Sequence, residues 1–394
     1  MYPPGADTVL VRHGDVNTKS RRVKRRMEGF LAENVEALLA DRGIPGEVER
    51  RWNRPLVHTD PDRVAEARGA ASDAFGVVSA SACLTTEPDL DAITDALAEV
   101  ARERYEEGSF AIDARRANKE LPFTSQDVAR EGGDAVWRVV EDEGEFEPEV
   151  DLDDPDLTFA VEVHGDVAFL SLDVEEGPGG LPLRTQAPLV ALVSGGIDSP
   201  VAAYEAMRRG SPVVPVYVDL GDYGGPDHEA RAIETVSRLA EYAPNTDLSV
   251  YRVPGGETVA HLAETMEQGR MLSLRRFFYL IAERVAGRTG ARGIVTGEAI
   301  GQKSSQTVRN LAVTDEVTDL PIHRPLLAWD KQEIIATARE IGTFEESTID
   351  AGCNRIAPDQ AETNARLDRL LEVEPDDLAA RAERAASEAT VVEP

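Results

Sequence analysis

The sequence predicts a multidomain chain of mixed α/β and α+β class, in which an α+β N-terminal half precedes a doubly wound parallel sheet. Its 394 residues are too many for one ordinary core, since domains of about 100–200 residues are the usual unit. From Pro188 onward strands and helices alternate, which is typical of a parallel sheet with helices on both faces. A cluster of turn residues, Gly177-Pro178-Gly179-Gly180, separates the two halves.

The first predicted domain, residues 1–60, has a short strand at Thr8 to Arg12 and a helix from Ser20 to about Asp41. Apolar residues recur along this helix at helical spacing and predict one buried face. Its beginning is strongly basic, with Lys19, Arg21, Arg22, Lys24, Arg25 and Arg26. A charge run is usually a solvated helix face. In a chain that is otherwise acidic, an isolated basic patch is the signature of phosphate contacts, so we expect these residues to bind nucleic acid.

The second predicted domain, residues 61–171, is an α+β unit. Its expected helices are 61–71, 90–105 and 125–140, and its expected strands are 75–81, 109–115, 157–163 and 167–172. A linker at 172–187 leads to the third domain, residues 188–394. There we expect strands at 189–193, 213–219, 248–253 and 293–296, and helices at 200–209, 228–242, 271–287 and 331–340.

Two local signals complete this prediction. Asp330, with Glu333 three residues on, has the form of a capping box at the start of the 331–340 helix. The end of the chain is predicted as an amphipathic helix followed by an acidic, frayed end.

The charge of the chain indicates its environment. There are 73 acidic against 42 basic residues, a formal net charge of −31, with 42% hydrophobic residues. This hydrophobic content argues against disorder and places the acidic excess on the surface. At molar salt the Debye length falls to about 3 Å and screens such a surface. The composition therefore indicates a halophilic source.

Other classes are disfavoured by what the sequence lacks. No apolar run approaches the ~20 residues that a membrane helix needs, and Met1-Tyr2-Pro3-Pro4 carries no secretion signal. We expect a cytoplasmic protein with no membrane partner. Cys83 and Cys353 are too few for a disulfide framework or a thiolate metal cluster, and we assign no metal-ligand set.

The hexamer S-G-G-I-D-S at 194–199 follows the first strand of the parallel sheet, and Pro200, a favoured first residue of a helix, comes next. Gly195 and Gly196 let the backbone approach a ligand, Ser194 and Ser199 offer hydroxyls, and amides at a helix N-terminus attract anions. We expect an anion to bind here. The sequence has neither a Walker-type Gly-Lys pair nor a G-x-G-x-x-G motif, which disfavours those two classes of nucleotide site.

A second block, T-G-E-A-I-G-Q-K-S-S-Q-T from Thr296 to Thr307, ends another strand of the same sheet. Ligands of open parallel sheets bind beyond the carboxyl ends of the strands, so both blocks should face one crevice.

These motifs resemble a known family. S-G-G-x-D-S is similar to the pyrophosphate loop of the ATP pyrophosphatase (PP-loop) superfamily, whose members adenylate a carbonyl or carboxyl oxygen and release pyrophosphate. Together, the two blocks resemble the 4-thiouridine synthetases of tRNA, the ThiI sulfurtransferase family, in the archaeal form without a rhodanese domain. The stretches R-R-A-N-K at 115–119 and P-F-T-S at 122–125 resemble a THUMP domain, an RNA-binding module, and the preceding segment resembles the family's ferredoxin-like domain.

The resemblance implies a site and its cofactors, ATP and Mg²⁺, with Asp198 organising magnesium and phosphate charge. The implied ATP-binding residues are Leu192, Val193, Ser194, Gly195, Gly196, Asp198, Ser199, Tyr217, Val218, Arg275, Gly297 and Gln306. From the residues alone, Arg275 could equally be a helix-surface arginine. The implied partner is tRNA, and Arg115, Arg116 and Lys119 join the six basic residues of the first helix as expected tRNA contacts.

Cys353 is expected to be catalytic together with Asp198. A lone cysteine is most often a small buried hydrophobe, but here Gly352, Asn354 and Arg355 mark an exposed turn in which the thiolate is favoured. Its position resembles the one that handles persulfide sulfur in the family. Because no rhodanese-like segment with its own cysteine is seen, we expect an external sulfur donor, a persulfide protein or sulfide. Cys83 is expected to be structural.

The resemblance implies that the 4-carbonyl oxygen of a uridine, the eighth nucleotide of tRNA, attacks the α-phosphate of ATP, after which sulfur displaces AMP. Three alternatives stay open: a 2-thiouridine synthetase of the same superfamily, an amidotransferase-type ligase of small molecules, and a non-catalytic tRNA-binding protein. The RNA-binding half argues against the ligase, and the intact 194–199 loop with Gln306 argues against the non-catalytic protein. The resemblance leaves open a further role, the transfer of sulfur to a sulfur-carrier protein in thiamine thiazole synthesis, although no residue of this sequence indicates it. A homodimer is also compatible with the sequence.

Overall fold

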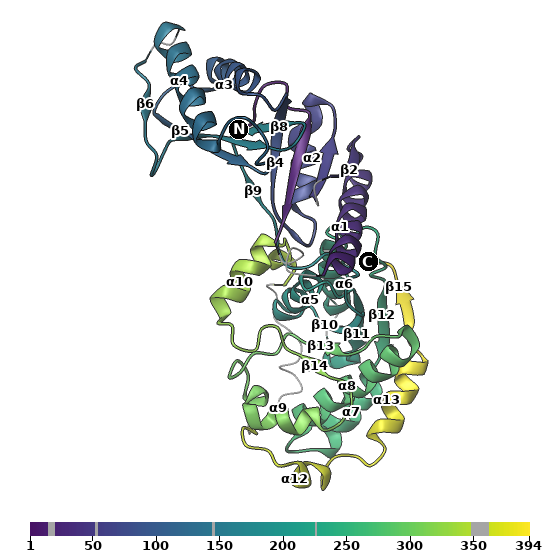
Figure 1. The fold of residues 1–394 in the computed structure, drawn as a ribbon. Helices are drawn as coiled ribbons and strands as arrows, with labels where there is room; N and C mark the ends of the chain where they lie inside the picture. Colours follow the sequence, from purple (N-terminus) through teal and green to yellow (C-terminus); the bar gives the residue numbers. More distant parts are fainter. Residues whose placement is uncertain (15–19, 52–53, 144–145, 225–226, 348–361) are drawn as a thin grey trace. The chain divides into compact units, whose positions relative to one another are not determined.

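Two separate sheets organise the chain in the computed structural model, which describes residues 1–14, 20–51, 54–143, 146–224, 227–347 and 362–394. The chain divides into two units, Met1–Pro182 and Leu183–Pro394, each with its own sheet and core (Figure 1). None of the described helices is long and apolar enough to cross a membrane.

The first unit contains a nine-stranded sheet of order β2-β3-β1-β4-β8-β7-β5-β6, with β9 beside β4. The elements of its first part are β1 (Thr8–His13), α1 (Arg21–Asp41), β2 (Glu47–Arg51), β3 (Arg54–His58), η2 (Pro61–Arg63), α2 (Val64–Ser72) and β4 (Val77–Thr86). The predicted apolar face of α1 is buried at Leu31, Val35 and Leu38, which pack with Val9 and Val57 of the sheet. The predicted first strand and helix are therefore present. The strands β2 and β3 were not predicted, because the β2 sequence is mostly charged and largely solvent-facing.

The rest of this unit follows the predicted α+β order. Its elements are α3 (Leu90–Arg104), β5 (Ser109–Arg116), α4 (Ser125–Glu143), β6 (Glu149–Val150), β7 (Leu157–Val163), β8 (Ala168–Ser171) and β9 (Glu175–Glu176). β4 extends further than predicted: it pairs with β1 through Val77 to Cys83 and with β8 through Leu84 to Thr86. One strand therefore belongs to both parts of the sheet.

A partly buried ion-pair cluster also joins the two parts. The Glu162 carboxylate, on β7, lies 2.6 Å from a guanidinium nitrogen of Arg12 on β1 and 2.7 Å from one of Arg54 on β3. Burial alone would raise the pKa of Glu162, but a hydrogen bond involving His164 and the charges of Arg12 and Arg54 outweigh it and hold this pKa far below its usual range. Glu162 therefore stays ionised and pairs with both arginines.

The second unit is built on a six-stranded sheet of order β14-β13-β10-β11-β12-β15. Its strands are β10 (Leu189–Val193), β11 (Val213–Asp219), β12 (Val250–Pro254), β13 (Ile294–Val295), β14 (Ile322–His323) and β15 (Thr390–Val392). The five strands from β14 to β12 are parallel, as predicted. β15 is antiparallel to β12. The prediction of a frayed C-terminal end was wrong, because Thr390–Val392 completes the sheet edge.

The connecting helices are α5 (Asp198–Arg208), η3 (Gly221–Tyr223), α6 (His228–Ala240), α7 (Gly256–Thr265), α8 (Arg270–Thr289), η4 (Ser304–Gln306), α9 (Val308–Asp315), α10 (Lys331–Glu340), α11 (Phe344–Ser347), α12 (Leu367–Leu371) and α13 (Leu378–Ser387). The capping box of α10 is confirmed: Asp330 accepts from the Glu333 amide and Glu333 from the Asp330 amide. α5 begins at Asp198, two residues before the predicted start at Pro200. The α5 N-terminus therefore lies inside the 194–199 hexamer.

Candidate functional site

One cavity of about 440 Å³ lies in the second unit, where β10, β11 and β13 reach their carboxyl ends. The 194–199 loop and the Thr296 to Thr307 block both line it, so the two blocks face one crevice as predicted. Of the twelve residues expected to bind ATP, these line the cavity: Leu192, Val193, Ser194, Gly196, Asp198, Ser199, Tyr217, Val218, Arg275, Gly297 and Gln306. Its size suits a nucleotide-sized ligand.

Gly195 does not line this cavity. It lies against α6, where a Cβ atom at this position would be 3.3 Å from Cβ of Arg231 and 3.4 Å from the carbonyl oxygen of His228. Gly195 therefore allows α6 to pack closely on the loop, a role that differs from the expected ligand contact.

The loop is closed by its own serines. The Ser199 hydroxyl accepts from the Ser194 amide at 2.9 Å and donates to the Ser194 carbonyl at 3.2 Å. The first turn of α5 has no side-chain cap, since its N-cap residue is Ile197. Amides at an uncapped helix start attract anions, so the loop is suited to phosphate.

Gly297 brings the second block against the phosphate loop. A Cβ atom there would lie 2.6 Å from the carbonyl carbon of Asp198 and 2.7 Å from its oxygen, closer than real Cβ contacts. Only glycine permits this approach of two backbones.

Two side chains that the sequence analysis did not identify hold the Asp198 carboxylate. The Lys331 ammonium, at the start of α10, lies 2.7 Å from Oδ1, and the Gln302 amide nitrogen lies 3.1 Å from Oδ2. The sequence feature that could have identified Lys331 is its position. It directly follows the capping residue of a helix that comes after another strand of the parallel sheet.

Arg275 points into the crevice and is not a free surface arginine: its side chain is 18% exposed. It forms an ion pair with Glu298. The Gln306 side-chain amide makes two hydrogen bonds in one of its two orientations. In that orientation the Gln306 oxygen accepts from Arg275 at 3.0 Å, and the Gln306 nitrogen donates to the Ala299 carbonyl at 2.8 Å. Arg276, the next residue on α8, is buried in a different ion pair, with Glu374.

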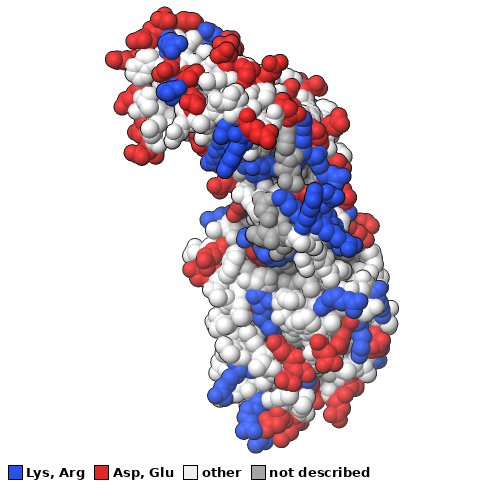
Figure 2. Space-filling model, in the orientation of Figure 1, with Lys and Arg blue, Asp and Glu red and all other residues white. Residues whose placement is uncertain are grey.

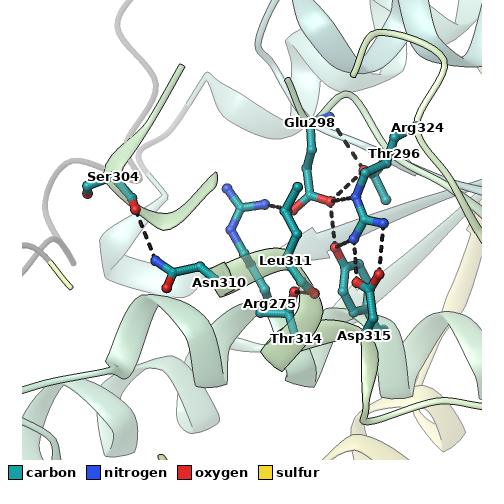
Figure 3. A network of polar contacts seen from close by, with 10 residues as sticks. Arg275, Thr296, Glu298, Ser304, Asn310, Leu311, Thr314, Asp315 and Arg324 are labelled. Atoms are coloured by element: carbon teal, nitrogen blue, oxygen red, sulfur yellow. Dashed lines mark hydrogen bonds and ion pairs between the residues drawn. The ribbon is translucent and has the colours of Figure 1, made fainter. Parts of the chain in front are cut away.

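A polar network surrounds Glu298, which is 4% exposed (Figure 3). Burial would raise the pKa of Glu298, but the charges of Arg275 and Arg324 outweigh it, so that the pKa is lowered. Glu298 and Arg324 were not identified by sequence analysis, because a buried carboxylate in a Gly/Ser-rich block gives no pattern.

The basic residues of α1 form a cluster in the first unit. Arg21, Arg22, Arg25 and Arg26 line one shallow surface hollow, and Figure 2 shows Lys and Arg side chains gathered over α1. The remaining two members differ: Lys24 lies 3.8 Å from Glu28, and Lys19 lies outside the described residues.

The expected contacts of the THUMP-like segment are less uniform. Arg115 is 71% exposed and pairs with Asp113. Lys119 is exposed. Arg116 donates to the carbonyl groups of Leu121 and Phe123, so part of its guanidinium supports the loop that follows β5.

The structure describes only one of the two cysteines. Cys353 lies outside the described residues. Cys83 is fully buried in β4, where burial raises the pKa of its thiol to about 12. This environment fits the structural role expected for Cys83.

Within the described part of the chain, no group of three or more His, Cys, Asp or Glu residues could hold a metal ion. Mg²⁺ is usually bound through one or two carboxylates plus substrate phosphates. The Asp198 carboxylate at the start of α5 meets this requirement, so the residues present fit a magnesium ion that arrives with a nucleotide.

Three family models match consecutive parts of the chain. They are the ThiI ferredoxin-like domain over residues 8–81, the THUMP domain over 87–173 and the thiamine biosynthesis protein ThiI over 184–376. A probable tRNA sulfurtransferase of Halobacterium salinarum is 59% identical over 379 residues, which cover 96% of this chain and 95% of that protein. One from Methanosarcina mazei is 38% identical over 368 residues, 93% and 90% of the two chains.

A solved structure matches nearly the whole chain. The crystal structure of a 4-thiouridine synthetase in complex with RNA and with bound ATP superposes with a TM-score of 0.84 at 28% identity, covering 98% of this chain and 99% of that one. The predicted arrangement of a ferredoxin-like domain, a THUMP domain and a parallel-sheet domain is therefore confirmed.

Proposed function

Because the chain belongs to the ThiI family of tRNA sulfurtransferases, we propose that it uses ATP to convert the uridine at the eighth position of tRNA to 4-thiouridine. The observation that carries this proposal is the crevice of the second unit, in which the phosphate loop and the second block line one nucleotide-sized cavity. Both substrates, ATP and tRNA, are cytoplasmic, so we place the protein in the cytoplasm.

The cavity is lined by both polar and apolar residues. Val218, Met271 and Phe278 line it together with the β11 backbone, a surface suited to a purine ring. The phosphates then fall at the 194–199 loop, beside the α5 N-terminus and the Lys331 ammonium.

In the proposed first step the uridine 4-carbonyl oxygen forms a bond to the α-phosphorus of ATP, and the bond to pyrophosphate breaks. The loop amides and Lys331 face the charge that builds up on the phosphate oxygens, and preorganised charge of this kind usually contributes more than any other effect to such catalysis. Magnesium, held by Asp198, would supply further neutralisation of phosphate charge. Adenylation makes the former carbonyl oxygen a leaving group.

The second step delivers sulfur. We propose that the terminal sulfur of a Cys353 persulfide, loaded by an external donor, attacks C4 of the activated base and AMP leaves. An outside thiol then attacks the Cys353 sulfur of the resulting S–S bond, which releases 4-thiouridine and leaves a mixed disulfide on Cys353. A second outside thiol reduces this mixed disulfide and restores the Cys353 thiol. Sulfide attacking C4 directly is the alternative, and it needs no thiol of the protein.

The basic cluster of α1 and the exposed cations near β5 support the proposed tRNA contacts in the first unit. They are concentrated cations in a chain of net charge −31, and such positions are where phosphate contacts are expected.

The test is to incubate the purified protein with ATP, sulfide and unmodified tRNA, and to measure pyrophosphate release and modified nucleosides. We expect release that depends on tRNA and a product that is 4-thiouridine. A 2-thiouridine product would overturn the position of thiolation, and the absence of tRNA-dependent pyrophosphate release would indicate a non-catalytic tRNA-binding protein. Nucleoside analysis of tRNA from a deletion strain, with its thiamine requirement, extends the test to the cell.

A further inference from the structure

We propose that Glu298 is a positioning residue for nucleotide binding, acting through Arg275. The inference rests on the proposed function, since the nucleotide is the ATP of that reaction. It concerns a side chain buried in the floor of the crevice, next to Gly297 on the second block.

The two carboxylate oxygens of Glu298 have different surroundings. Oε2 accepts from the Tyr279 hydroxyl at 2.7 Å, from the Thr296 hydroxyl at 3.0 Å and from Nε of Arg324 at 2.7 Å. Among the described residues, Oε1 accepts from Arg275 alone. Figure 3 shows the two arginines approaching Glu298 from opposite sides. Oε2 is therefore fully held by the protein, whereas Oε1 is used to hold Arg275.

Two of the three nitrogens of the Arg275 guanidinium donate hydrogen bonds to the protein. One terminal nitrogen donates to Glu298 and the other to Gln306, which fixes the plane of the guanidinium. Its Nε is buried and has no partner among the described residues. A buried donor without an acceptor is costly. Arg275 lines the cavity, so its orientation by Glu298 and Gln306 sets how its guanidinium faces a bound nucleotide.

Arg324 is a second cation beside Glu298, and it compensates the Glu298 charge when Arg275 moves. It is 9% exposed and bonds both oxygens of Asp315, at 3.0 and 2.5 Å, besides Glu298. The network thus holds two carboxylates and two guanidinium groups. If Arg275 shifts toward a nucleotide, Arg324 and the two hydroxyls still compensate the Glu298 charge, so nucleotide binding does not leave a bare carboxylate in the interior.

The competing explanation is that Glu298 only joins α8, the second block and the loop before α10. A purely structural carboxylate would lower the stability of the protein without changing the nucleotide affinity of its folded fraction. A matched control lies one residue away: the Arg276–Glu374 pair uses the same helix and is also buried, with side chains 7% and 6% exposed, but neither residue lines the cavity.

The experiment measures binding of a non-hydrolysable ATP analogue by calorimetry, without tRNA, in the full chain. The variants are Glu298→Gln, Arg275→Ala, the double variant and the control Glu374→Gln, each with its thermal unfolding. Glu298→Gln and Arg275→Ala should each weaken binding roughly 10-fold or more, since each loses a charged hydrogen bond. The dissociation constant of the double variant should lie within about twofold of that of the single variant that binds more weakly, because both changes remove the same interaction. Glu374→Gln should bind like the parent.

Parental affinity in folded Glu298→Gln, or losses that add in the double variant, would overturn the role of Glu298. If Glu298→Gln does not fold, Glu298→Asp replaces it: the charge is kept, but the shorter side chain cannot reach Arg275 while bonded to Arg324. Parental affinity of that variant would overturn the inference equally. A parent protein that does not bind the analogue would instead overturn the proposed function.

Discussion

The ammonium group of Lys331 lies 2.7 Å from Oδ1 of Asp198, although 133 residues separate them in the chain. The contact joins the first turns of α5 and α10, two helix starts at the same edge of the sheet. A cation is thus placed beside the acidic residue of the phosphate loop, next to the helix start where we expect phosphates to bind.

Replacing Asp198 by Ala should reduce tRNA-dependent pyrophosphate release by about 100-fold or more, because the carboxylate that would hold magnesium is lost. tRNA affinity, measured by filter binding, should stay within about twofold of the parent, since this residue lies in the crevice of the second unit. Normal pyrophosphate release would remove Asp198 from the proposed chemistry.

Replacing Lys331 by Met should lower the rate of adenylation by roughly 10- to 100-fold, because a fixed positive charge near the phosphates is removed. Lys331→Arg should recover part of this loss. The neighbouring exposed residue on the same turn supplies the control, and Gln332→Ala should leave single-turnover rates unchanged. Equal rates in Lys331→Met and the parent would show that the ion pair with Asp198 is structural.

Changing Arg22, Arg25 and Arg26 together to Gln should weaken tRNA binding at high salt by roughly 10-fold and flatten its dependence on salt, because fewer phosphates are neutralised. The matched control changes three exposed arginines of the second unit, Arg366, Arg369 and Arg384, and has the same change in net charge. ATP affinity should be unchanged in both. If the two triple variants bind tRNA alike, the α1 cluster is only a solvated helix face.

The two thiols should differ in reactivity. At pH 8 we expect a disulfide reagent to modify one thiol of the native protein and two in denaturant, because burial protects Cys83 and raises its pKa to about 12. Cys353→Ser should show no reactive thiol when native, and it should release pyrophosphate with tRNA yet form no 4-thiouridine. Parental levels of 4-thiouridine in this variant would favour direct attack by sulfide.

Glu162→Gln should lower the free energy of unfolding by about 1–3 kcal/mol at neutral pH, since two arginines lose a partly buried counter-charge. The folded pKa of Glu162 is lowered. Its stabilisation is therefore complete above the unfolded value of about 4.3 and is lost as the pH falls through the folded pKa. Denaturant unfolding at several pH values should show a constant gap between parent and variant above pH 5 and a shrinking gap below about pH 4. A gap of the same size throughout would contradict this account.

The sequence predicted the elements that carry strong periodicity or clear boundary residues. β10, β11 and α10 begin and end where expected, and the capping box locates the start of α10. Among the missed strands, β2 is mostly charged, and β14 and β15 have only two and three residues and lie at sheet edges, each beside one partner strand. Such segments are ordered by a neighbour that local sequence does not reveal.

The crevice itself was predictable from the S-G-G-I-D-S loop and the Thr296 to Thr307 block, because both end strands of one parallel sheet. The contacts that these two blocks make with other segments could not be predicted from the sequence. The Asp198–Lys331 and Glu298–Arg324 pairs join side chains from segments far apart in the sequence, and neither partner has a distinctive spacing. The contact of Gly297 with Asp198 likewise depends on how closely two backbones approach.

The shared strand β4 determines how the first unit can be divided. Val77 to Cys83 complete the sheet of the first part, and Leu84 to Thr86 continue directly into the second. A fragment that stops before Val77 leaves β1 without a partner on one side, and a fragment that starts after Thr86 does the same to β8. We therefore expect the two parts to unfold and refold as one cooperative block, and recombination between related genes to exchange this module whole.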